Sequence, residues 1–164
     1  MRFSSLFSSD AFAKGAVRYN KYFGTQMALQ RLVIPIKLVG AGWTAAIVDT
    51  GAGICIFRPE VVAPLHLEQH PEMILDDMIT TVRGVMYVGH VYPLSLIVRA
   101  DFGDDITISC PVFIPQQIVI NGQPASIARS PLTINLLGWR GFLDVLRFAV
   151  DPADSTFYFG AIER

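Results

Sequence analysis

Short runs of β-branched and aromatic residues, each ended by glycine or proline, constrain this sequence more than any other feature. The chain has 13 glycines and 10 prolines among its 164 residues, and they recur between the apolar runs along most of its length. A strand can be this short, whereas a helix needs about ten residues without a breaker. The sequence therefore predicts an all-β barrel or sandwich with one or two short helices.

The expected elements follow from these runs. Pro35 has no amide hydrogen, so it marks an edge or a gap in the ladder of its strand. Gly84 suits a tight turn that joins two strands in a long hairpin. Strands are expected at residues 32–38, 43–48, 54–57, 79–82, 85–98, 106–111, 118–120, 149–151 and 156–159, and helical segments at 59–65 and 140–148. The second helix is indicated by the spacing of Phe142, Leu143 and Leu146.

The chain is apolar for a protein of its size. Hydrophobic residues make up 52% and charged residues 16%, where about 25% charged is usual. A chain of this length fits one domain. We expect that domain at residues 28–164, preceded by an N-terminal leader or arm at residues 1–27. Apolar surface left over from the core favours a homo-oligomer.

Several classes of function are not indicated. The formal net charge is −1 and the basic residues are scattered, so no nucleic-acid surface is predicted. His66 and His70 lie beside prolines with no further ligand nearby, so we expect neither a metal nor a cofactor. The uncharged stretch 106–128 contains three prolines and reads as strands and turns, which argues against a membrane span.

Cysteine usage bears on the compartment. Cys55 and Cys110 are far apart in a chain with an adequate core, so they are expected to be buried free thiols. Free thiols and the lack of a secretory signal favour a cytoplasmic location. A transit segment within the serine-rich N-terminus is the alternative.

An acid and two glycines stand where a buried strand ends: residues 46–53 read AIVDTGAG. A second motif, NLLG at residues 135–138, comes directly before the expected second helix. In this order the two motifs resemble those of the retropepsin-like aspartic proteases, the single-lobe family named for the retroviral enzymes. The resemblance covers residues 31–160.

This resemblance implies a closed acid-protease barrel that hydrolyses polypeptides. In that chemistry two carboxylates share one proton; one activates a water and the other protonates the substrate. The chain has one Asp-Thr-Gly, because the near repeat at residues 154–156 reads Asp-Ser-Thr. The resemblance therefore implies a homodimer in which Asp49 of each subunit meets its twin on a two-fold axis.

Further roles come from the same resemblance. Thr50 is expected to hydrogen-bond across the two-fold axis, and Gly51 to donate its N–H to the carboxylates. The remaining site residues divide into substrate contacts (Ala52, Gly53, Gly84, Val85 and Met86, the last three on a hairpin that closes over the cleft) and braces of the Asp49 loop (Leu136, Leu137, Gly138 and Arg140).

The chain departs from the family after its second motif. Many members carry Gly-Arg followed by an acid or amide, and the arginine stabilises their dimer. Here the residues are Gly138-Trp139-Arg140-Gly141, so the arginine is one place late and the acid or amide is replaced by Gly141.

Three hypotheses of different class remain. The first is an active aspartic endopeptidase, favoured by the intact Asp-Thr-Gly. The second is a retropepsin-fold dimerisation or peptide-binding module without turnover, kept open by Gly141. The third is an unrelated β-barrel carrier in which Asp49 merely ends a strand.

Overall fold

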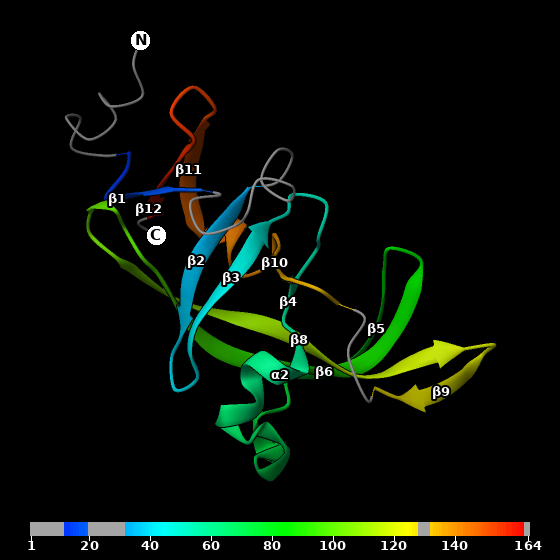
Figure 1. The fold of residues 1–164 in the computed structure, drawn as a ribbon. Helices are drawn as coiled ribbons and strands as arrows, with labels where there is room; N and C mark the ends of the chain where they lie inside the picture. Colours follow the sequence, from blue (N-terminus) through cyan, green and yellow to red (C-terminus); the bar gives the residue numbers. More distant parts are fainter. Residues whose placement is uncertain (1–11, 20–31, 128–131, 163–164) are drawn as a thin grey trace.

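The computed structural model describes residues 12–19, 32–127 and 132–162 (Figure 1), and strands dominate these ranges. One sheet contains β2 (Val33–Leu38), β3 (Gly42–Val48), β4 (Cys55–Ile56), β5 (Asp76–Val82), β6 (Val85–Val98), β8 (Ile106–Ile120), β9 (Gln123–Ser126) and β10 (Asn135–Leu137). The other contains β1 (Gly15–Arg18), β7 (Phe102–Gly103), β11 (Leu146–Asp151) and β12 (Thr156–Ala161). The helix α2 (Pro59–Val62) and four 3₁₀ turns (Ala63–Leu65, Leu67–Gln69, Pro71–Met73 and Leu143–Val145) complete the elements.

The larger sheet closes on itself. Its strand order is β5-β6-β2-β3-β10-β4-β8-β9, and β6 also pairs with β8, so β6, β2, β3, β10, β4 and β8 form a ring. Closure removes the free edges that a sheet of this size would otherwise expose. Apolar side chains from all six strands fill the interior. The prediction of an all-β closed barrel with little helix is confirmed.

The β6–β8 ladder is the longest in the barrel and extends beyond it at the end that carries the β5–β6 turn. It runs from Val98 opposite Ile106 to Met86 opposite Val119, with a bulge at Val88 and Gly89. A side chain at position 89 would overlap the backbone of Ile114, so glycine lets the two strands approach there. The bulged ladder carries β5 and β9 outward as an arm (Figure 1).

The expected helix at residues 140–148 is wrong. Gly141 has a φ of +82°, which no right-handed helix can contain. A 3₁₀ turn, Leu143–Val145, follows, and the chain then enters β11, which pairs with β12 from Leu146 opposite Ala161. The buried side chains in this segment face the core from a turn and a strand, so their spacing gave a false helical period.

The two strands expected at residues 106–111 and 118–120 are one strand, β8. The prolines between them suggested a break. Pro111 lies one residue before the β4 ladder, which begins at Val112, and Pro115 lies at the bulge opposite Gly89. Both prolines therefore occupy positions where a missing amide hydrogen costs little.

Pro35 lies at a gap in a ladder, as predicted. Strand β2 pairs with β3 along its whole length, but its pairing with β6 starts only at Ile36. The hairpins 32–38/43–48 and 79–82/85–98 and the helical segment after Pro59 are also present.

Part of the expected N-terminal arm is a strand. Residues Gly15–Arg18 pair with β12 on one side and with β7 on the other, and Ala16 and Val17 are buried. Four residues are too few for periodicity to identify a strand, so the sequence gave no sign of it. The rest of the arm, residues 1–11 and 20–27, lies outside the described residues.

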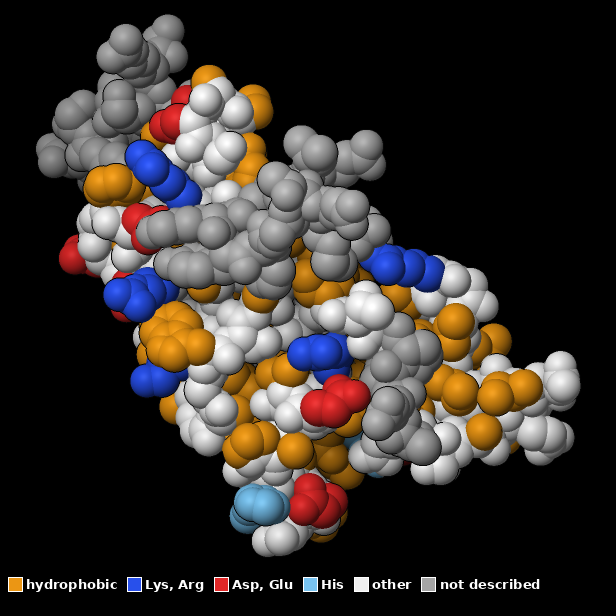
Figure 2. Space-filling view, in the orientation of Figure 1, with side chains coloured by type: hydrophobic (Ala, Val, Ile, Leu, Met, Phe, Trp, Pro, Cys, Tyr) orange, Lys and Arg blue, Asp and Glu red, His pale blue; other side chains and the backbone are white. Residues whose placement is uncertain are grey.

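Apolar surface is left over, as the composition suggested. Ile79, Met86 and Ile120 are each more than 40% exposed, and all three lie on the arm formed by β5, β6, β8 and β9. Figure 2 shows apolar side chains gathered on this arm. Within the described ranges, no helix is long and apolar enough to cross a membrane, and no cluster of three metal-binding side chains occurs.

The two cysteines are buried free thiols, as predicted. They lie on the neighbouring strands β4 and β8, and their thiols are hydrogen-bonded to each other. This hydrogen bond, together with burial, raises the pKa of the Cys110 thiol well above its ordinary value. The same hydrogen bond lowers the pKa of the Cys55 thiol against the opposing effect of burial. Both side chains are buried, so neither thiol is accessible to a reagent in the folded protein.

We expect iodoacetamide to modify neither Cys55 nor Cys110 in the folded protein and both after unfolding in denaturant, because a thiol must be exposed and ionised to react. Intact-mass spectrometry before and after denaturation measures this. Rapid native modification of either cysteine would contradict the buried arrangement.

Candidate active site

Asp49 leaves the barrel directly after β3. Strand β10 runs parallel to β3, with Leu136 opposite Ile47 and Leu137 opposite Val48, and the Asp49 N–H donates to the Leu137 carbonyl at 2.9 Å. The chain then turns, because the Ala52 N–H donates to the Asp49 carbonyl at 3.1 Å. The Gly51 N–H donates to Asp49 Oδ1 at 2.9 Å, which fixes the orientation of the carboxylate.

Residues 138–140 hold the Asp49 loop, residues 49–54, by backbone hydrogen bonds. The Trp139 N–H donates to the Ala52 carbonyl at 2.9 Å and the Arg140 N–H to the Gly53 carbonyl at 3.1 Å. The indole Nε1 of Trp139 donates to the Thr50 carbonyl at 2.6 Å. The two segments are so close that a Cβ on Gly138 would lie 2.6 Å from the Ala52 carbonyl oxygen.

Asn135, the first residue of the NLLG motif, is a buried polar brace. Its Nδ2 donates to Thr44 Oγ1 at 3.0 Å and to the Ala45 carbonyl at 2.8 Å. Its Oδ1 accepts the Arg58 N–H at 3.0 Å. One side chain therefore ties β10 to β3 and to the start of α2, and burial strengthens such a satisfied network. Sequence reasoning gave Asn135 no role of its own.

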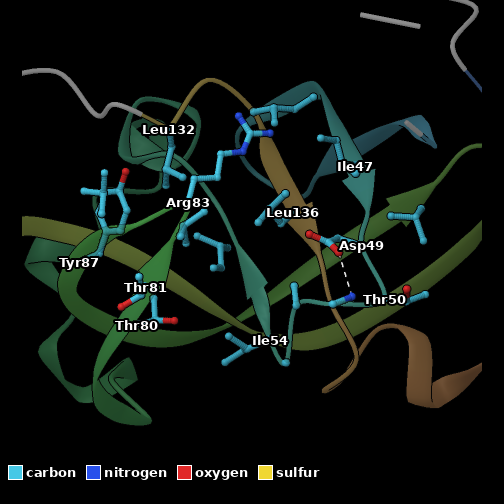
Figure 3. A pocket seen from close by; sticks show the side chains of 18 of the residues that line it. Ile47, Asp49, Thr50, Ile54, Thr80, Thr81, Arg83, Tyr87, Leu132 and Leu136 are labelled. Atoms are coloured by element: carbon cyan, nitrogen blue, oxygen red, sulfur yellow. Dashed lines mark hydrogen bonds between the residues drawn. The ribbon is translucent and has the colours of Figure 1, made fainter. Parts of the chain in front are cut away.

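Asp49 faces a cleft of about 730 Å³. Figure 3 shows its carboxylate pointing into this space from one wall, with Leu136 beside it and the β5–β6 hairpin on the far side. The other lining residues named by sequence analysis are Thr50, Gly51, Ala52, Gly53, Val85, Leu136 and Arg140. Leu137 and Gly138 are buried behind the loop.

Gly84 and Met86 are not among the described residues that line the cleft. Gly84 is at the hairpin tip with open space around it, and Met86 is on the outer face of the arm, opposite Val119. Side chains alternate along a strand, so Val85 and Tyr87 face inward and Met86 faces outward. Arg83 lies in the two-residue turn between β5 and β6, where strand alternation does not apply, so nothing in the sequence indicated that it lines the cleft.

Other lining residues were not among the predicted site residues, although the hairpin that carries several of them was predicted to close over the cleft. They come from the first hairpin strand, from the segment before β10 and from the barrel wall: Leu32, Ile47, Val48, Ile54, Ile56, Met78, Thr80, Thr81, Val82, Arg83, Tyr87, Leu132, Thr133 and Ile134. Burial raises the pKa of the Tyr87 hydroxyl, and the nearby positive charge of Arg83 partly offsets this. Figure 3 shows the Arg83 side chain reaching from the hairpin into the cleft.

Gly141, the departure from the family, has a local cause. Its backbone is left-handed, and a side chain there would overlap Pro111 and Cys110 on β8. Its N–H donates to Asp144 Oδ1 at 2.7 Å. An acid or amide at position 141 would not fit the space beside β8, and Asp144, three residues later, accepts the hydrogen bond of the free backbone N–H.

Comparisons with known proteins give a likeness of fold. No protein-family model matches the chain, and no curated protein matches it. One similar solved structure is the crystal structure of a retropepsin-like aspartic protease from Rickettsia conorii. The two chains are 15% identical, the alignment covers 93% of this chain and 98% of that one, and the TM-score is 0.49. A likeness of this size says nothing about individual residues of the cleft.

We expect Gly138→Ala to lower the free energy of unfolding by about 2 kcal/mol or more, because the new methyl group must push the Asp49 loop away from residues 138–140. Gly53→Ala is the matched control: its Cβ would meet nothing within 4 Å, so a change within about 0.5 kcal/mol is expected. Urea denaturation followed by tryptophan fluorescence measures both. Equal losses would contradict the close approach at Gly138.

Proposed function

We propose that the protein is an aspartic endopeptidase of the retropepsin type, acting as a homodimer. The observation that carries the proposal is an Asp-Thr-Gly turn whose carboxylate is oriented by the Gly51 N–H and faces a cleft large enough for several peptide side chains. A turn residue that merely ended a strand would need neither the cleft nor the backbone support from residues 138–140.

The need for a second carboxylate supports the dimer. Among the described residues that line the cleft, Asp49 is the only acid, and one carboxylate cannot both accept a proton from water and supply one to the substrate. A second copy of the chain related by a two-fold axis supplies it. The surface around the motif suits such contact: Thr50 and Gly51 are exposed, and Trp139 next to them is 44% exposed.

The proposed reaction is general acid–base hydrolysis. The ionised Asp49 takes a proton from a water as the water oxygen adds to the peptide carbonyl carbon. The protonated Asp49 of the other subunit gives its proton to the carbonyl oxygen. When the tetrahedral intermediate collapses, the C–N bond breaks and the first carboxyl passes its proton to the departing nitrogen. The second carboxylate takes back the proton of one hydroxyl of the intermediate as the new carbonyl forms. The pair ends with one proton, as it began.

We expect Asp49→Asn to reduce cleavage of unstructured peptides by roughly a thousandfold or more, as removal of a member of a coupled catalytic group does, while the solution mass stays that of a dimer. Peptide cleavage followed by mass spectrometry between about pH 3 and 7 and light scattering at several concentrations measure the two effects. Asp154→Asn is the control, because Asp154 is an exposed acid in the β11–β12 turn away from the cleft.

The outcomes separate the hypotheses. Unchanged cleavage by Asp49→Asn removes Asp49 from the chemistry and overturns the proposal. A stable dimer that cleaves no peptide in the parent form favours a dimerisation or peptide-binding module without turnover. A strict monomer at all concentrations overturns the shared site, because a single chain then lacks the second carboxylate.

A further inference from the structure

The cleft carries an excess of positive charge. Among the described residues that line it, the charged side chains are Asp49, Arg83 and Arg140. Two guanidinium groups therefore face one carboxylate. General acid–base hydrolysis needs carboxylates and a water, and neither arginine has a part in it. Arg140 belongs to the segment that holds the Asp49 loop, so Arg83 is the charge that calls for a separate explanation.

Arg83 occupies a position that turn geometry does not favour for arginine. Val82 pairs with Val85, so Arg83 and Gly84 form a two-residue hairpin loop, with φ values of +52° and +79°. This is the geometry of a type I′ turn, where asparagine or glycine is strongly preferred at the first position. A left-handed backbone is unfavourable for arginine, so the turn itself gives no reason for this side chain.

The guanidinium of Arg83 is available to a ligand. Figure 3 shows its side chain directed from the hairpin into the cleft, on the side where Leu132 and Leu136 lie. Within the described parts of the chain, no ion pair involves Arg83, and its charge acts on the Tyr87 hydroxyl. No carboxylate of the described residues therefore neutralises the Arg83 guanidinium.

The side chains around Arg83 determine which groups of a ligand can lie beside the group that binds the guanidinium. Val82, Val85, Leu132 and Leu136 line the same cleft and offer apolar surface to neighbouring side chains. A guanidinium with such surroundings binds a carboxylate through two parallel N–H···O hydrogen bonds. The matching ligand is an extended peptide in which apolar residues flank one aspartate or glutamate.

We propose that Arg83 is a specificity-determining residue that binds an acidic side chain of the substrate, so that the cleft selects apolar peptides containing Asp or Glu. The inference rests on the proposed function only in taking a peptide as the occupant of the cleft. Binding and cleavage test it separately, because Asp49→Asn retains Arg83 and the apolar walls.

The experiment uses two sets of fluorescein-labelled peptides rich in valine and phenylalanine. One set carries a single glutamate, moved along the peptide, and the other carries glutamine at the same positions. Anisotropy titrations with full-length Asp49→Asn measure binding, and kcat/KM of the parent protein measures cleavage. At one position we expect glutamate to be preferred about tenfold, which is typical of a charged hydrogen bond at a partly exposed site.

Substitution of the arginine assigns that preference. In the Asp49→Asn background, Arg83→Gln is expected to bring the glutamate-to-glutamine ratio to about one, and Arg83→Glu to favour peptides with lysine at that position. Arg99→Gln is the matched control, because Arg99 lies over the Trp43 ring and does not line the cleft; the ratio is expected to stay unchanged. Thermal unfolding checks that each variant is folded.

Each outcome bears on a different claim. Cleavage without a glutamate preference, or a preference that survives Arg83→Gln, overturns the role of Arg83 and leaves the endopeptidase proposal standing. Glutamate-selective binding without cleavage by the parent supports the role of Arg83 and overturns the endopeptidase proposal. Absence of both binding and cleavage overturns the two together.

Discussion

The site depends on one close backbone contact, between the Asp49 loop and residues 138–140. Parallel pairing of β3 with β10 brings the ends of the two strands to the same edge of the barrel. The N–H of Asp49 and those of Trp139 and Arg140 are then satisfied by carbonyls of the opposite segment. Glycine at position 138 is what permits this spacing. An exposed carboxylate can be held in a fixed position only because the backbone beneath it is paired in this way.

The two walls of the cleft differ: one is formed by paired barrel strands and the other by an exposed hairpin. Asn135 and the β3–β10 ladder lie on barrel strands whose side chains are largely buried. The opposite wall is a hairpin whose tip, Arg83 and Gly84, is exposed and extends away from the barrel (Figure 1). The proposed roles fit this contrast, since a carboxylate that acts in catalysis needs a fixed position and a side chain that binds a substrate needs to be accessible.

The sequence could predict what depends on local chemistry and neighbouring strands. The first hairpin, the position of Asp49 and the gap at Pro35 follow from alternation, turn residues and the missing proline donor. The failures have tertiary causes. Phe142, Leu143 and Leu146 show a helical spacing, but the left-handed backbone at Gly141 and pairing with β12 impose a turn and a strand. Strand β1 is too short for any period and exists through its pairing with β12 and β7. Alternation along β6 excludes Met86 from the site, but it does not extend through the turn, so it could not assign Arg83 to the cleft.

Gly141 shows how a departure from a sequence pattern can have a local structural cause. From the sequence, loss of the acid or amide reads as decay of the motif, and it was the main reason to consider a module without turnover. In the structure, β8 passes so close to position 141 that only glycine fits, and Asp144 accepts the N–H that the turn leaves free. The turn thus still contains an acid, Asp144, which accepts a hydrogen bond from the backbone N–H of Gly141. Gly141 begins a turn that leads into β11, and the hydrogen bonds from residues 138–140 to the Asp49 loop are present beside it. Gly141 is thus accounted for by the local packing, and the proposed turnover depends on Asp49 and on whether two copies of it meet.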